Sequence, residues 1–83
     1  MEEQQVLDTS KQVAINYMKD EFGINFKVEH ADFSPMGAVD VEGYDKANKK
    51  NELTVTVNAG DNYDVTGVGM TEKILPVKKS ENK

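Results

Sequence analysis

A single histidine limits the chemistry that this chain could perform. His30 is the only imidazole among its 83 residues, and there is no cysteine. A nucleophilic hydrolase needs a serine, threonine or cysteine beside a base that a third group orients. The serines Ser10, Ser34 and Ser80 fall in an expected helix, turn and tail, and none lies in a Gly-x-Ser-x-Gly motif. We therefore predict that the protein is not an enzyme and has no catalytic residue.

The best candidate for a metal site is the pair His30 and Asp32. The two residues are separated by one position in a presumed strand, so both side chains could point to the same face. Asp40 or Glu42 on the next strand could add a carboxylate ligand. Alternating charged residues are also typical of the solvated face of a sheet. We favour that interpretation and predict no metal ligand.

The other polar motifs also fit a structural role. Residues 58–64 (Asn-Ala-Gly-Asp-Asn-Tyr-Asp) offer oxygen ligands but lack the spacing and the bidentate glutamate of a calcium-binding loop. Asp40 and Glu42 alternate with apolar residues, whereas acid–base catalysis needs a desolvated pocket that separates two pKa values. Gly67-Val68-Gly69 lacks the third glycine and the following helix of a nucleotide-binding loop. No cofactor is predicted.

An amphipathic segment near the N-terminus is the element around which the rest must be arranged. Its apolar residues recur at steps of three and four, which is the spacing of one helix face. They are Val6, Leu7, Val13, Ala14, Tyr17, Met18 and Phe22, with Ser10 completing the row. Gly23 can take the left-handed conformation that ends a helix, and Ile24 can then fold back on Met18. A helix over about residues 4–22 is predicted.

Beyond Gly23 the apolar residues alternate with polar ones, as in strands with one buried face. Strands are predicted over residues 24–28, 38–44, 52–58 and 63–70. One helix followed by an antiparallel four-stranded meander gives an α+β fold of two layers. We predict a single domain over residues 1–77 and a disordered tail over residues 78–83.

Irregularities are expected at three places in the sheet. The alternation of the first strand slips near Glu29 and His30, which indicates either a bulge or the end of the strand. The polar residues 45–51 are predicted to form a mobile hairpin loop. Val68 and Met70 fall on the outer face, unless a bulge at a neighbouring glycine moves them inward.

The helix is expected to cover one face of the sheet, with Tyr17, Met18 and Phe22 above its apolar residues. Those residues are Val39, Val41, Leu53, Val55 and Val57. Replacing Phe22 by alanine would cost about 3–5 kcal/mol if its ring is fully buried. The other face stays open and carries Lys27, Asp40, Glu42, Thr54, Thr56, Asp64 and Thr66.

Net charge and hydropathy exclude two classes of partner. The net charge of −5 repels phosphate backbones, and the pair Lys78-Lys79 is too small to form a basic stripe, so no nucleic acid is expected. No apolar run is as long as the about 18 residues that a transmembrane helix needs.

The polar start Met1-Glu2-Glu3 is not a signal peptide. It fits an intracellular protein and equally a domain whose leader has been removed.

A set of apolar residues remains on turns, strand ends or the outer face. It consists of Phe33, Met36, Tyr44, Val68 and Met70. An exposed apolar cluster marks a protein-binding surface, so we predict that these residues contact an unknown protein partner or a second copy of the chain. Edge strands offer a second route, in which another chain adds a strand to the sheet.

The order of these elements resembles an uncharacterised family of small lipoproteins of Gram-positive bacteria. The resemblance covers about residues 6–70 and rests on Gly23-Ile24, residues 32–37 (Asp-Phe-Ser-Pro-Met-Gly), Glu42-Gly43-Tyr44 and Val65-Thr66-Gly67. It implies a leader and a lipid-bearing cysteine before the domain, and a place on the extracellular face of the membrane. This chain has neither, so any lipid anchor is absent from it. The layout is also similar to cystatin-like domains, which bind partners.

We therefore predict a non-enzymatic, protein-binding domain of a cell-envelope lipoprotein, of an inhibitor or immunity type. The family has no accepted activity, so the resemblance assigns no functional residue. The alternatives are a domain that binds a small ligand or metal on the open sheet face through His30 and Asp32, and a minor enzyme.

Overall fold

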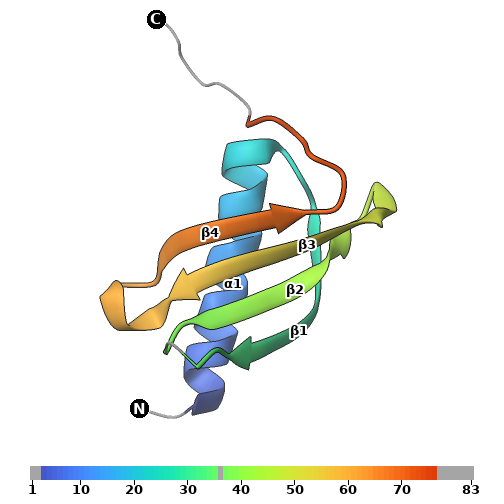
Figure 1. Cartoon of the computed structure of the whole chain (residues 1–83). Coiled ribbons are helices and arrows are strands. Elements are labelled where there is room, and N and C mark those ends of the chain that lie inside the picture. Colours follow the sequence, from blue (N-terminus) through green and yellow to red (C-terminus); the bar gives the residue numbers. More distant parts are fainter. Residues whose placement is uncertain (1–2, 36, 77–83) are drawn as a thin grey trace, which may run out of the picture.

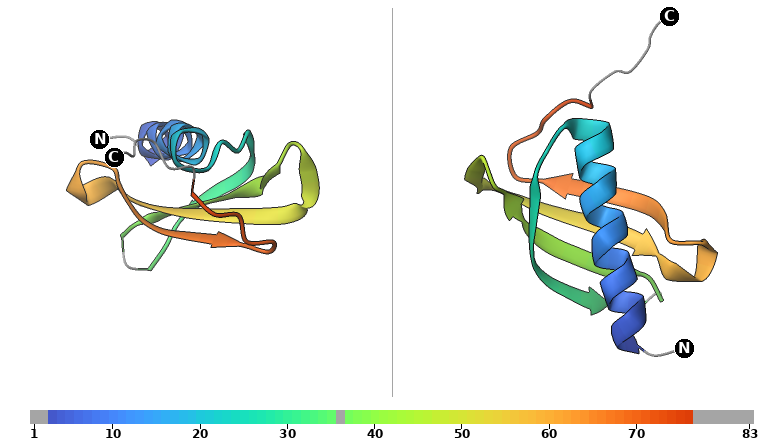
Figure 2. Two further views of the ribbon diagram at one scale, coloured as in Figure 1. Left: turned by 90° about the horizontal axis from the view of Figure 1, so that it is seen from above. Right: turned by 180° about the vertical axis from the view of Figure 1, so that it is seen from behind.

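The computed structural model describes residues 3–35 and 37–76. Helix α1 (Glu3–Phe22) is followed by strands β1 (Phe26–Phe33), β2 (Val39–Asp45), β3 (Asn48–Asn58) and β4 (Asp64–Met70), with the short 3-10 helix η1 (Ala59–Asp61) before β4. The strands form one antiparallel sheet in the order β1-β2-β3-β4 (Figure 1). Figure 2 shows α1 lying across one face, so the predicted α+β fold of one helix on a meander is confirmed.

The end of α1 follows the local signals of the sequence. Gly23 has a positive φ of 67°. Its N–H donates to the Lys19 carbonyl at 3.0 Å, and the Ile24 N–H donates to the Met18 carbonyl at 3.1 Å. This pair of bonds closes a helix when a glycine follows its last turn. The predicted helix end, including the return of Ile24 to Met18, is confirmed.

The core lies between α1 and the sheet. Four residues spaced four apart on α1 are buried, namely Val6, Ser10, Ala14 and Met18. The buried apolar residues that face them are Ile24, which precedes β1, and the sheet residues Phe26, Val39, Val41, Leu53, Val55 and Val57. Met18 is fully buried as predicted, whereas Tyr17 and Phe22 are only half-buried at the sides of the helix.

The bulge, one of the two alternatives predicted for the first strand, is confirmed. The register of β1 on β2 shifts between Val28 and His30. An extra residue reverses the facing of those that follow it. Phe33 therefore pairs with Val39 on the helix-covered face, while the alternating His30 and Asp32 lie on the open face away from α1.

The predicted mobile loop over residues 45–51 is wrong. Only residues 46–47 form the turn, and β3 already begins at Asn48. Asp45 and Asn51 are buried, at 7% and 0% exposure. The Asp45 Oδ1 accepts the Ala47 N–H at 2.9 Å, which closes a tight turn. Polar composition was misleading here because the side-chain oxygens replace water as acceptors.

In the last strand, Val68 and Met70 lie on the inner, helix-covered face, which is one of the two predicted arrangements. Asn62 and Tyr63 have positive φ values of 60° and 57°, so the turn includes Tyr63 and β4 begins one residue later than predicted. The register of β4 on β3 shifts between Thr56 and Val57. This bulge places Val68 opposite Val55 and Met70 opposite Leu53, on the helix-covered face. The expectation that Val68 and Met70 lie on the outer face is wrong.

Candidate partner-binding groove

The structure distributes the predicted partner-binding residues over different surfaces. Phe33 is 39% exposed at the end of the edge strand β1. Tyr44 lies on the open face, between Lys27 of β1 and Glu52 of β3. Val68 and Met70 lie on β4, at the opposite edge from Phe33. Met36 and the predicted tail lie outside the described residues. Of the four described members, only Val68 and Met70 come together.

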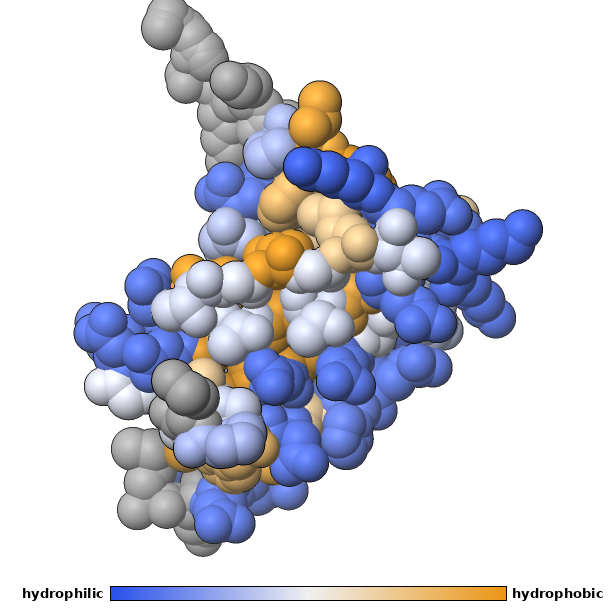
Figure 3. Space-filling view, viewed as in Figure 1, coloured by the Kyte–Doolittle hydropathy of each residue, from blue (hydrophilic) through white to orange (hydrophobic). Residues whose placement is uncertain are grey.

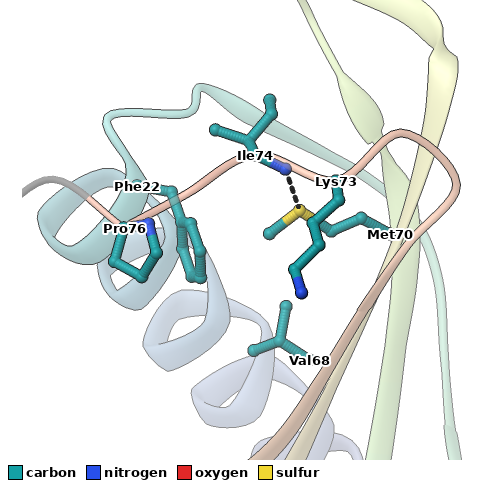
Figure 4. Close-up of a pocket in the computed structure, with 6 residues that line it drawn as sticks. All are labelled: Phe22, Val68, Met70, Lys73, Ile74 and Pro76. Carbon is teal, nitrogen blue, oxygen red and sulfur yellow. Dashed lines mark hydrogen bonds between the residues drawn. The ribbon is translucent and has the colours of Figure 1, made fainter.

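Val68 and Met70 form part of an apolar groove beside the end of α1. The groove, called here the β4 groove, has a volume of about 380 Å³. It is lined by Phe22, Val68, Met70, Lys73, Ile74 and Pro76 (Figure 4). The sequence reasoning missed the contributions of Phe22, Lys73, Ile74 and Pro76. The signal for Ile74 and Pro76 was the short apolar run after the last strand, and Phe22 was predicted only as part of the apolar helix face.

The helix wall of the groove is the half-buried ring of Phe22. It is steadied by Tyr17, whose ring centroid lies 6.4 Å away at an interplanar angle of 55°. Tilted aromatic pairs at this separation are favourable. Because α1 ends directly after Phe22, the ring lies at the edge of the helix and faces the segment after β4 (Figure 4).

The second wall is residues 71–76, which belong to no helix or strand but are tied to the start of β3. The Thr71 N–H donates to the Glu52 carbonyl at 3.0 Å. The Glu72 N–H donates to the Oδ1 of the buried Asn51 at 2.8 Å. These bonds return the chain toward α1 after β4 ends, so that Lys73, Ile74 and Pro76 can line the groove.

Met70 joins this segment to the floor of the groove. Its Sδ accepts the Ile74 N–H at 3.3 Å, drawn in Figure 4 as a dashed line. Sulfur is a weak acceptor and the methionine side chain is flexible. The floor can therefore adjust to the shape of a bound group more readily than a branched side chain would allow.

Lys73 adds a positive charge to the otherwise apolar groove. Among the six lining residues it is the only charged one, and it is exposed at the mouth. In Figure 4 its side chain extends from the segment after β4 in the direction of Val68. An apolar groove with a single cation at its mouth suits an apolar group that carries or adjoins a carboxylate.

The open sheet face carries His30 and Asp32, the candidates for a metal site. His30 and Asp32 pair with Glu42 and Asp40 across β1 and β2, and the His30 Nε2 lies 3.8 Å from the Asp32 Oδ2. The Thr56 Oγ1 donates a hydrogen bond to the Asp40 Oδ1 at 3.0 Å, so that oxygen already has a partner. Within residues 3–35 and 37–76, no three histidine, cysteine or carboxylate side chains are placed to hold a metal ion.

Hydropathy differs along the open face of the sheet, which is the face turned to the viewer in Figure 3. Figure 3 shows hydrophilic side chains over β1 and β2 and apolar ones near the end of β4 and in the segment after it. Leu75, which is 74% exposed, belongs to this segment. Among the described residues, no helix has the length and apolar character needed to cross a membrane.

Comparison of the chain with models of protein families, with curated proteins and with solved structures finds no match. The resemblance to the small lipoproteins therefore stays a prediction. Function has to be argued from the β4 groove itself.

Replacing Asn51 with alanine is expected to loosen the second wall of the groove. The substitution leaves the Glu72 N–H without its acceptor and should lower the free energy of unfolding by about 1–3 kcal/mol. Amide exchange at Glu72 should accelerate relative to the parent. The matched control is Asn48→Ala, which removes two exposed bonds, from the Asn48 Nδ2 to the Glu72 Oε1 and from the Lys50 N–H to the Asn48 Oδ1. Equal effects of the two variants would contradict the role given to Asn51.

Proposed function

We propose that this chain is a non-enzymatic binding domain that recognises another protein through the β4 groove. The observation that carries the proposal is the cavity of about 380 Å³, whose lining is apolar except for Lys73. Binding sites of this kind combine apolar area with a small number of polar groups that orient the bound chain. The groove offers both within one short stretch of surface.

The location proposed for the domain is the extracellular face of the membrane, as part of a cell-envelope lipoprotein. The support is the resemblance of residues 6–70 to that family. An in-frame leader that ends in a cysteine, encoded upstream of Met1, is the expected finding. Translation that begins at Met1 in the native cell would contradict this part of the proposal.

The binding proposal is tested by selecting peptides from a displayed random library on the immobilised domain. The enriched peptides are then titrated into the isotope-labelled domain, and amide chemical shifts are followed. The largest shifts are expected at Val68, Met70 and Ile74, around the groove. Shifts confined to His30, Asp32 and their neighbours would instead favour a ligand site on the open face.

A pair of neighbouring substitutions makes this test specific for the groove. Ile74→Ser removes a lining side chain and should weaken binding about tenfold, which corresponds to about 1.4 kcal/mol. Leu75→Ser is the control, because Leu75 is more exposed and does not line the groove. Equal affinities of the parent and Ile74→Ser for every enriched peptide would overturn the proposed function.

A further inference from the structure

The helix is longer than the sheet is wide. A helix of 20 residues, such as α1, measures about 30 Å, whereas four strands at about 4.8 Å spacing span roughly 15 Å. α1 runs across the strands and its last turn projects past β4, as seen from both sides of the sheet in Figures 1 and 2. The β4 groove lies at this projecting end and is only partly filled by residues 73–76.

The two edges of the sheet differ in their protection. Edge strands in natural proteins are blunted by charged side chains and bulges. The edge strand β1 has a bulge beside Glu29 and carries Lys27, Glu29, His30 and Asp32. In contrast, no charged residue lies between Asp64 and Glu72 in the stretch that contains β4. After its bulge, β4 pairs regularly with β3 through its last four residues.

Two glycines in β4 have no role that the chain itself explains. A Cβ at Gly69 would meet nothing within 4 Å, and one at Gly67 would meet only Thr56, at 3.9 Å. Neither glycine has a positive φ. Glycine weakens a strand, and its presence there often marks the close approach of another backbone. Paired with Thr56 and Thr54, the two glycines lie on the open face, where they leave room for the side chains of a neighbouring strand.

We propose that the partner adds a fifth strand to the sheet, hydrogen-bonded to the outer edge of β4. This inference rests on the proposed function and specifies the partner. A strand about 4.8 Å beyond β4 would lie beneath the projecting turn of α1. Side chains at alternate positions would then share the face of Val68 and Met70 and enter the groove. A carboxylate in the added segment would pair with Lys73.

The partner is thus an extended segment of another protein, with alternating apolar side chains and an aspartate or glutamate. A second copy of the chain is the less suitable occupant. Each copy carries a net charge of −5, and like charges oppose association. Joining two β4 edges in one sheet would also bring the two projecting helix ends toward each other instead of filling the groove with a strand.

The test uses the tightest peptide from the selection on the full chain, synthesised in three forms. One is unmodified, and the others are N-methylated at either the odd or the even amides. In an edge-bound strand only alternate N–H groups face the sheet. One methylated form should therefore lose about tenfold or more in affinity. The other should bind within about threefold of the unmodified peptide. Amide exchange in Gly67–Met70 should slow on binding.

Charge is tested with two lysine variants that change the net charge equally. Lys73→Glu should weaken the unmodified peptide about tenfold. Lys50→Glu, at an exposed site that does not line the groove, should have little effect. If both methylated peptides bind as tightly as the unmodified one and the amide chemical-shift changes are still centred on the groove, the fifth strand is overturned but the proposed function is not. Absence of any groove-binding peptide would overturn both. Size-exclusion chromatography with light scattering would detect a dimer. A dimer formed through β4 would mean that the added strand comes from a second copy of the chain and not from another protein.

Discussion

Replacing Gly43 with alanine is expected to leave little folded protein. A Cβ at this position would overlap the carbonyl oxygen of Lys27 and would lie 2.9 Å from Cε1 of the Phe26 ring. The first contact involves backbone, so β1 would have to move away from β2 to relieve it. The Phe26 ring is buried in the core at 4% exposure and has little room to retreat. The cost should exceed about 4 kcal/mol, in the range of the most damaging single substitutions.

The matched control for Gly43→Ala is Gly69→Ala. The added methyl group at Gly69 meets nothing within 4 Å, and its φ is not positive. Alanine loses less conformational entropy on folding than glycine does, so the domain should gain about 0.5–1 kcal/mol or stay unchanged. Urea unfolding followed by circular dichroism compares the two variants. A Gly43→Ala protein with the midpoint of the parent would show that Phe26 and Lys27 do not approach Gly43 closely.

The second large effect is expected at Met18. This side chain is fully buried on α1 and is among the largest in the core. Its replacement by alanine leaves a cavity and should cost about 2–5 kcal/mol. Thermal and urea unfolding measure the loss. An unchanged melting temperature for Met18→Ala would mean that α1 does not cover the sheet.

Phe22→Ala is the informative comparison for Met18→Ala. The sequence suggested a cost of about 3–5 kcal/mol for a fully buried Phe22 ring. The ring is instead half-buried and lines the β4 groove, so roughly half of that cost is expected. Phe22→Ala should still weaken peptide binding, because it removes the helix wall of the groove. A larger loss of stability from Phe22→Ala than from Met18→Ala would contradict the observed burial.

Much of the fold could be predicted from signals that are local in the sequence. The end of α1 was predictable because Gly23 and the spacing of apolar residues act within one or two turns of the chain. The slip in the alternation of β1 was visible in the sequence and allowed either a bulge or a strand end, and the pairing with β2 shows the bulge. The facing of Val39 and Val41 followed from the same alternation, and both are fully buried.

Long-range pairing decided where the sequence left alternatives. The side on which Val68 and Met70 lie depends on the register shift in the pairing of β4 with Thr56 and Val57 of β3. Those two residues are separated from β4 in the sequence by the connection between the strands. Asn51, near the start of β3, is buried and accepts the N–H of Glu72, which follows β4 about twenty residues later in the chain. Neither interaction leaves a periodic signal in the sequence.

The candidate site is the clearest product of the tertiary structure. The sequence by itself indicated a helix, a meander and a surplus of apolar residues, and it indicated no catalytic group. Only the packing brings Phe22 of α1 together with Val68 and Met70 of β4 and with Ile74 beyond it. The physical reason is that a groove is formed by the length of α1 relative to the sheet, together with the bulge that turns β4 inward. Both are relations between distant segments, which no local pattern of residue types can express.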